Sequence, residues 1–415
     1  MALDARRAAE QAARQSYGKL IAFLAARFRD VPAAEDALSD AIAAALSTWP
    51  ERGIPANPEA WLLVAAKRNL LRRVRHENVR AGARDRIMMA FEEAEERMNA
   101  DNSTFPDERL KLLFVCAHPA LDRSAHTPLM LQSVLAVDAA TIAKAFLVSP
   151  QAMSQRLVRA KIKIRDAHIP FVVPDRSLLS DRLESVLSAI YAAYGIGWDG
   201  VDGETGKQGS LADEAIWLGR TLLATLPQEP EAAGLLSLML YSESRRGARR
   251  DATGQYVPLD QQDTALWNEE MIIEADNLLR QAGAFGSLGP FQCQAAIQSV
   301  HANRRRSGVT DWTALAMLYE ALVIMKPTVG ARVSHAAVIG RVQDAAAGLA
   351  LLNRIAERDI VNYQPYWAVR AHLLTEAGET ASASSAYRTA IGLSDSEAVR
   401  QFLQTRLDAV APPDL

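Results

Sequence analysis

The chain has 415 residues, of which 49% are hydrophobic and 23% charged, and its formal net charge is −3. These values exclude intrinsic disorder as the default and suit a folded protein of about two to four domains. No apolar run reaches the roughly 18 residues that a membrane-spanning helix needs, and the charged N-terminal stretch does not resemble a signal sequence. We therefore expect a cytoplasmic protein with no membrane partner.

The two cysteines, Cys116 and Cys293, lie far apart in the sequence. This spacing supplies neither a disulfide framework nor a metal-ligand cluster, and it suits a reducing cytoplasm. Cys116 and His118 resemble half of a metal site, but no second pair completes it. A buried cysteine and a turn histidine before Pro119 are the simpler interpretation, so we expect no metal and no other cofactor.

The first segments of the chain have the period of amphipathic helices. Residues 8–29 predict an alanine-rich helix, and residues 33–49 predict a second one. Glu35, Asp36 and Asp40 give the second helix an acidic edge. Acidic residues near a helix start are also explained by the helix dipole alone, so this edge has a purely structural alternative.

A proline-rich loop at 50–58, which we expect to be fixed and irregular, precedes a basic helix predicted over 59–80. The apolar stripe of this helix consists of Leu63, Ala66, Leu70 and Val74. The opposite side carries Arg68, Arg72 and Arg75. One face therefore suits a core and the other a phosphate backbone. Trp61 and Asn69 border the basic side, and each has two interpretations. Trp61 either stacks on an exposed base or packs in the core, and Asn69 either bonds to a base or is solvated.

Residues 141–165 predict two short helices around a tight turn. The first helix covers 141–146, and the second begins at Pro150, because Ser149 is a favourable N-cap and proline is favourable at the first helical position. The second helix has an apolar stripe made of Met153, Leu157, Ala160 and Ile164. A neighbouring stripe carries Gln155, Arg156, Arg159 and Lys163. This pattern is typical of a helix-turn-helix motif.

In such a motif the second helix enters the major groove of DNA. By position, the side chains that would read bases are Gln151, Ser154, Gln155 and Arg159. Those that would hold the phosphate backbone are Arg156, Lys161, Lys163 and Arg165. The alternative is an ordinary helical hairpin with a solvated basic face. Basic residues also crowd 67–80, whereas 91–107 is acidic, so contact with a polyanion is expected to be local.

Beyond Asp175 the pattern predicts more helices, over 180–194, 211–226, 230–243, 264–283 and 290–304. The glycine-rich stretch 195–209 matches no phosphate-binding or calcium loop and is interpreted as a connector. A short run contains Arg245, Arg246, Arg249 and Arg250. It is interpreted as a solvated loop, with a surface for nucleic acid or an acidic partner as the alternative.

The last hundred residues contain a repeat pattern of small residues at helix crossings and large residues in the gaps. One unit is formed by Trp367, Ala371, Leu374, Gly378, Ala383, Tyr387 and Ala390. A looser unit before it is formed by Val333, Ala336, Gly340, Ala345, Leu349 and Leu352. This pattern predicts about two degenerate tetratricopeptide-like units and a protein-binding surface. No spacing of catalytic residues is apparent, so we do not expect an enzyme.

Four segments in this order resemble a bacterial sigma factor of the extracytoplasmic-function class. They are AEDALSDAIAAAL (34–46), AWLLVAAKRNLLRRVR (60–75), DERLKLLFVCAHPAL (107–121) and SQRLVRAKIKIR (154–165). The long remainder, which begins with PFVVP at 170–174, is similar to a subgroup that carries a helical, tetratricopeptide-like extension. The resemblance implies binding to core RNA polymerase through the clamp helices of its largest subunit and its flap, and binding to promoter DNA.

The resemblance also implies roles for particular residues. Positions 34–46 match the helix that docks on the polymerase clamp, which makes Asp36, Ser39 and Asp40 interface candidates. The family's Arg-Asn pair for the minus-ten element falls on Arg68 and Asn69, and the loop 50–58 would receive a flipped base. The contact positions for the minus-35 element fall on Ser154, Gln155, Val158 and Arg159. Ser154 departs from the basic residue often found there, and Leu147-Val148 replaces the usual small turn residue.

The expected fold is therefore all-α, with two small helical sigma domains followed by a tetratricopeptide-like solenoid or bundle. The expected segments are a polymerase and minus-ten domain (8–80), an acidic linker (81–106), a helix-turn-helix domain (107–168), a helical extension (175–305) and the repeats (306–411). The leading hypothesis is a sigma factor regulated by its extension through an intramolecular or protein partner. The alternatives are a free-standing helix-turn-helix regulator with an interaction domain, and a helical scaffold with solvated basic faces.

Overall fold

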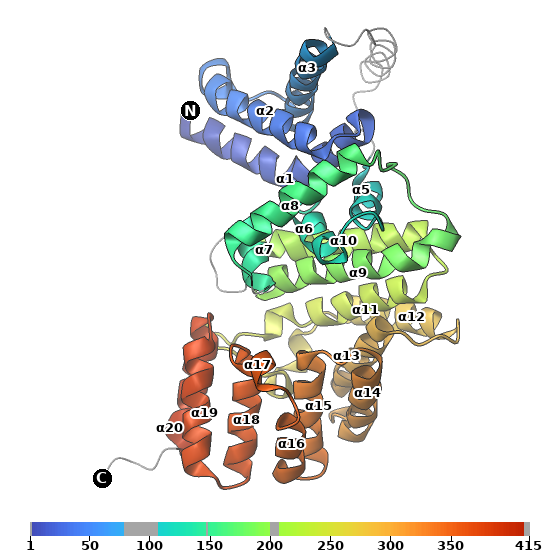
Figure 1. Ribbon diagram of the computed structural model, residues 1–415. Helices are drawn as coiled ribbons and strands as arrows, with labels where there is room; N and C mark the ends of the chain where they lie inside the picture. Colours follow the sequence, from blue (N-terminus) through green and yellow to red (C-terminus); the bar gives the residue numbers. More distant parts are fainter. Residues whose placement is uncertain (1, 79–106, 147, 200–206, 411–415) are drawn as a thin grey trace. The chain divides into compact units, whose positions relative to one another are not determined.

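The computed structural model describes residues 2–78, 107–146, 148–199 and 207–410 (Figure 1). Within these ranges the chain is helical, with no β-strand and a single isolated bridge between Arg250 and Tyr256. The all-α prediction is therefore confirmed for the described residues. The predicted linker 81–106 and residue Leu147 lie outside them.

The chain forms two compact units, Met1–Ala193 and Tyr194–Leu415, and helix α9 spans the boundary between them. The helices of unit 1 are α1 (Ala2–Phe28), α2 (Val31–Arg52), α3 (Pro58–Asn78), α5 (Arg109–Cys116), α6 (Arg123–Ser133), α7 (Ala139–Ala145), α8 (Pro150–Asp166) and the first part of α9 (Arg176–Asp199).

Helices α1, α2 and α3 pack on one another, α3 through the stripe that the sequence predicts. On α3, Leu63, Ala66 and Leu70 are buried. Helix α2 begins at the cap formed by Asp30, whose carboxylate accepts a hydrogen bond from the amide of Ala33 at 2.9 Å. It continues through Pro50 to Arg52, so the predicted start of an irregular loop at residue 50 is wrong. A proline in the last turn removes one hydrogen bond without breaking the earlier turns.

Helices α5 to α8 form the second part of unit 1, and several of them begin at side-chain caps. Asp138 accepts hydrogen bonds from the amides of Ala140 and Thr141 at the start of α7, and Ser149 accepts one from Ala152 at 3.2 Å at the start of α8. The predicted boundary at Ser149 and Pro150 is thus confirmed. The two helices of the predicted helix-turn-helix motif contact each other.

A close backbone contact joins the two parts of unit 1. A Cβ atom at Gly18 of α1 would lie 1.8 Å from the carbonyl oxygen of Val134, which follows α6. Only a glycine allows this approach. Helix α1 also packs against α5, and α2 against α8. The helices before and after residues 79–106 therefore share one core.

The described part of unit 2 after α9 consists of helices and the segments that connect them. The helices are α10 (Lys207–Thr225), α11 (Pro230–Glu243), η1 (Arg246–Ala248), η2 (Leu259–Gln261), η3 (Thr264–Leu266), α12 (Glu269–Gly283), α13 (Pro290–Ser307), α14 (Trp312–Met325), α15 (Val329–Val342), α16 (Ala345–Leu352), α17 (Glu357–Ile360), α18 (Gln364–Glu376), α19 (Thr380–Leu393) and α20 (Glu397–Val410).

The C-terminal helices form consecutive hairpins, in which α15 pairs with α16 and α18 with α19 (Figure 1). Small residues lie where some of these helices approach one another closely. A Cβ atom at Gly340 would lie 2.4 Å from a methyl carbon of Leu373, and Ala371 and Ala383 are fully buried. Gly378 has φ +78° in the turn between α18 and α19, a conformation that favours glycine.

Two predictions for the start of unit 2 are wrong. The glycine-rich connector expected over 195–209 is helical up to Asp199 in α9 and again from Lys207 in α10. The ring of Trp198 stacks on Tyr194 with a centroid distance of 5.8 Å, and this aromatic packing supports the last turn of α9. The arginine run, for which the sequence predicts a solvated loop, is partly buried.

Replacing Gly18 by alanine should lower the free energy of unfolding by about 1–3 kcal/mol, because the carbonyl of Val134 cannot rotate away as a side chain could. Urea unfolding followed by circular dichroism measures this. Gly392→Ala in α19 is the matched control, since nothing lies within 4 Å of its Cβ position. It should be neutral or stabilising by up to about 1 kcal/mol. Equal effects of the two substitutions would contradict the close packing of α1.

Candidate functional site

Helix α8 has a buried stripe and an exposed polar face. The stripe consists of Met153, Leu157, Ala160 and Ile164, all buried as predicted. The exposed face carries Gln151, Ser154, Gln155, Val158, Arg159 and Lys163. Val158 is 56% exposed. The arrangement presents hydrogen-bonding, apolar and basic groups on one side of one helix.

Two arginines of α8 are held by hydrogen bonds to backbone carbonyls. Nε of Arg159 donates to the carbonyl of Gln155 at 3.3 Å, and Nη1 of Arg156 donates to that of Ser124 at 3.5 Å. Arg159 remains exposed, whereas Arg156 is half-buried beside α6. These contacts leave Arg159 better placed than Arg156 to meet a ligand.

Lys161 does not lie where the sequence suggests. It was expected to hold a phosphate, but it is buried, and Nζ contacts Oε2 of Glu35 and Oε1 of Gln132, each at 2.6 Å. Ser133 donates a further hydrogen bond to Oε1 of Glu35 at 3.1 Å. The pair therefore joins α8 to α2 inside unit 1. Periodicity alone did not reveal it, because Lys161 lies at the border between the two stripes.

Helix α3 presents a second basic face. Arg68 and Arg72 are exposed opposite the buried stripe, as predicted, and Asn69 is half-buried, with its amide donating to the carbonyl of Ala37 at 3.4 Å. Arg75 lies on the helix, but its side chain is outside the described part of the structure. The ring of Trp61 packs edge-on against Trp49 with a centroid distance of 5.5 Å, which favours its interpretation as a packed core residue.

The acidic edge of α2 divides into an inner and an outer part. Glu35 turns inward to Lys161, while Asp36, Ser39 and Asp40 are exposed. Nη1 of Arg73 on α3 lies 2.7 Å from a carboxylate oxygen of Asp36, and Nη2 lies 3.5 Å from one of Asp40. The hydroxyl of Ser39 donates to the carbonyl of Glu35. An incoming partner at this edge would compete with Arg73 for the two aspartates.

The arginine run of unit 2 is structural in part. Arg245 is 7% exposed, and its Nη1 has no hydrogen-bond partner. Burial lowers the pKa of Arg245 to about 10, with Arg249 and Arg304 contributing in the same direction. Arg246 forms an ion pair with Glu243, and the guanidinium of Arg249 lies 4.3 Å from the ring centroid of Trp198. The sequence carried no periodic signal for this cluster.

Neither cysteine has the surroundings of a reactive or metal-binding group. Cys116 and Cys293 are both buried and free, and burial raises the pKa of each thiol, for Cys293 to about 11. Nδ1 of His118 accepts a hydrogen bond from the amide of Ala120, as expected for a turn residue. The described residues contain no group of three His, Cys, Asp or Glu side chains that could hold a metal ion. Nor do they include a helix with both the length and the apolar character needed to cross a bilayer.

Comparison with known proteins gives a relative but no activity. Residues 182–283 match a family of unknown function (DUF6596). An uncharacterized protein of Rhizobium meliloti (strain 1021) is 34% identical over 400 residues, which cover 96% of this chain and 93% of that protein. No solved structure matches the chain.

Removing one partner of the pair between Glu35 and Lys161 should destabilise unit 1. Glu35→Leu should cost about 3 kcal/mol of unfolding free energy, because it leaves the ammonium of Lys161 without a carboxylate in a buried place. The double variant with Lys161→Met should lose less, since no unpaired charge remains. Urea unfolding of the wild type, both single variants and the double variant gives the coupling energy. Asp36→Asn, at an exposed neighbouring position, serves as the control, and additive losses would show that the two side chains do not interact.

Proposed function

We propose a function from the site alone, because the chain belongs to the same family as the uncharacterized Rhizobium meliloti protein, which it matches along nearly its whole length and whose name gives no activity. In this proposal the chain is a promoter-specificity subunit, a sigma factor of the extracytoplasmic-function type. In this proposal unit 1 binds core RNA polymerase and promoter DNA. The helices of unit 2 form a tetratricopeptide-like extension that regulates this activity.

The exposed face of α8 is the observation that carries the proposal. Its polar and basic side chains point away from the buried stripe, and the helix starts at a capped turn directly after α7. This is the disposition that a recognition helix needs to place its first turns at base edges and its later cations at phosphates. Arg159 would read a base, and Lys163 would hold the backbone.

Helix α3 supports the proposal with a second basic face in the same unit. Arg68 and Arg72 are exposed, while the side of the helix that faces α2 is apolar and buried. A basic helix beside a melted strand can hold its phosphates, and a nearby loop can accept an extruded base. The loop after α2, which begins at Gly53, would fill that role.

The acidic outer edge of α2 distinguishes the leading proposal from a free-standing regulator. A regulator that only binds duplex DNA has no need of an exposed acidic edge on a helix beside the basic face. A sigma factor needs one to dock on the polymerase clamp. We assign this docking role to Asp36, Ser39 and Asp40.

Run-off transcription with purified core polymerase, with and without this chain, tests the proposal. Templates would carry promoter regions taken from around its own gene. Transcripts that appear only when the chain is present would support the sigma-factor function. A salt-dependent shift of duplex DNA without any transcript would favour the free-standing regulator. If neither transcripts nor a shift are observed, the helical scaffold is the remaining hypothesis.

Substitution of Arg159 should change sequence preference. If its guanidinium makes a bidentate base contact, Arg159→Ala should cost about 1–3 kcal/mol at one promoter position and little at others. Lys163→Ala should instead weaken binding to all sequences and reduce the salt dependence of the binding constant. Fluorescence anisotropy with a set of single-base promoter variants compares the two. A uniform loss for Arg159→Ala would reassign it to a phosphate.

Reversing the charge of the α2 edge should abolish binding to core polymerase. In the variant Asp36→Lys with Asp40→Lys, two cations would face the partner where two carboxylates stood, while the helix stays intact by circular dichroism. Glu51→Lys is the matched control, because Glu51 is exposed on the last turn of the same helix. Size-exclusion co-elution with core polymerase measures the effect, and retained binding in the double variant would exclude this docking edge.

A further inference from the structure

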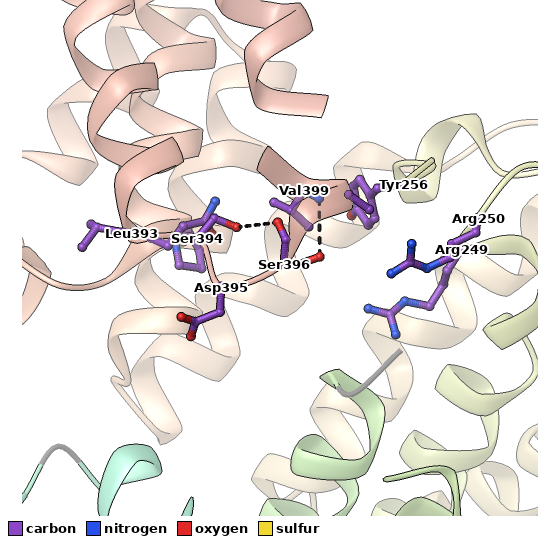
Figure 2. A pocket seen from close by; sticks show the side chains of 11 residues that line it. Arg249, Arg250, Tyr256, Leu393, Ser394, Asp395, Ser396 and Val399 are labelled. Carbon is purple, nitrogen blue, oxygen red and sulfur yellow. Dashed lines mark hydrogen bonds between the residues drawn. The ribbon is translucent and has the colours of Figure 1, made fainter. Parts of the chain in front are cut away.

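Charged side chains have partners in both units, but with different consequences. In unit 2, Arg249 and Arg250 line a cavity of about 370 Å³ together with Asp395 (Figure 2). Nη1 of each arginine donates to a backbone carbonyl of the same unit at 2.7 Å, so these charges hold unit 2 together. In unit 1 the pair of Glu35 and Lys161 instead joins two groups of helices, the first half (α1 to α3) and the second half (α5 to α8) of that unit.

The interface between the two halves of unit 1 combines a close backbone contact with a buried ion pair. Gly18 of α1 meets the carbonyl of Val134, as described above. Nζ of Lys161 lies 2.6 Å from Oε2 of Glu35, and these two side chains are only 10% and 16% exposed. Ser133 donates a hydrogen bond to the other carboxylate oxygen. The pair therefore depends on one relative position of α2 and α8.

A buried ion pair adds little net stability to such an interface. Removing both charges from water costs several kcal/mol, which their attraction roughly offsets, and apolar replacements of similar volume are often as stable or more stable. Once the halves separate, the carboxylate of Glu35 and the ammonium of Lys161 are both solvated again. The pair therefore specifies how the halves close without preventing them from opening.

The proposed function requires the halves to move apart. Arg68 and Arg72 of α3 are assigned to the minus-ten element, and Arg159 of α8 to the minus-35 element. The names of these elements place them about 25 base pairs apart, which is about 85 Å of B-form DNA. A compact unit of the length of Met1–Ala193 is about 40 Å across. Unit 1, as packed in this structure, cannot reach both elements of a straight duplex at once.

Closure leaves each DNA-binding face uncovered. Arg68, Arg72 and Arg159 are all exposed in this structure. Either half can therefore meet its own element while unit 1 is closed. What closure prevents is simultaneous contact, and with it the gain in affinity that two linked binding sites obtain from a high effective concentration.

We propose that this structure is the closed form of unit 1, that the pair of Glu35 and Lys161 is the latch of this form, and that contact with both promoter elements requires the latch to open. The role in transcription rests on the proposed function. The opening itself is a property of unit 1 and can be measured without DNA or polymerase.

Pulsed electron paramagnetic resonance on the full chain, with one spin label on each half, measures closure. Ser47→Cys in α2 and Ala120→Cys before α6 place the labels at exposed positions, and both native cysteines are buried. With no other substitution, the main population of distances should lie below about 50 Å. Circular dichroism checks that each labelled variant is folded.

Glu35→Gln should open unit 1. In the closed form the buried ammonium of Lys161 would lose its carboxylate, whereas in the open form it is solvated and loses nothing. The ratio of long to short distances should therefore rise at least about tenfold. Glu51→Gln, the same substitution at an exposed position in the last turn of α2, is the matched control and should leave the distances unchanged.

Two apolar side chains should restore closure. In Glu35→Leu with Lys161→Met no buried charge remains unpaired, so the distances should return to those of the chain without these substitutions. The same distances with and without Glu35→Gln would overturn the latch. A long population that persists in the double variant would overturn it as well, because the opening would then not arise from an unpaired charge.

The labelled chain with native Glu35 and Lys161, bound to core polymerase and promoter DNA, gives a measurement that does not depend on how a latch variant folds. The distances should lengthen by at least about 20 Å in this complex. Short distances in a complex that makes transcripts would overturn the proposal and leave the sigma-factor function intact. Absence of transcripts together with opening in Glu35→Gln would reject the sigma-factor function and the promoter role, and leave the latch as a property of unit 1.

Discussion

The structure depends on one constraint, which is that every helix must bury its apolar stripe against another helix. In the described residues no sheet is present to cover such a stripe. The narrow stripes of α3 and α8 therefore decide which way each helix is rotated in unit 1, and this rotation places Arg68, Arg72 and Arg159 at the surface. The proposed DNA-binding faces are thus a consequence of core packing, because the side chains opposite a buried stripe have only solvent or a ligand to meet.

Charge is handled in two different ways in the two units. In unit 1 the buried ammonium of Lys161 meets Glu35 and Gln132, and Ser133 donates to Glu35, so the buried charge is paired within the fold. In unit 2 the buried guanidinium of Arg245 has an unpartnered nitrogen and lies near two other cations. The first arrangement joins helices on either side of residues 79–106. The second leaves one nitrogen of a buried cation without a hydrogen-bond partner.

The family of unknown function covers the segment that carries the arginine run. Its match, residues 182–283, includes Trp198 and the arginine run, whereas α3 and α8 lie outside it. Within the match, backbone carbonyls are held by arginines from elsewhere in unit 2. Nη1 of Arg305 donates to the carbonyls of Thr264 and Trp267, and Nη2 of Arg304 donates to that of Gln262. The long segment between α11 and α12 is ordered by these cations.

The sequence by itself determined most of the helices in the described residues and the rotation of α3 and α8. Apolar residues at helical spacing, the cap at Ser149 and the repeat of small residues around Gly340 act over one or two turns, so their consequences can be derived locally. Only the tertiary structure decided the partners of the charges. Whether Lys161 meets a phosphate or Glu35, which lies 126 positions earlier, depends on how distant helices pack. The same holds for the arginine run, because an aromatic ring and backbone carbonyls brought close by folding partly bury a segment that the sequence predicts as a solvated loop.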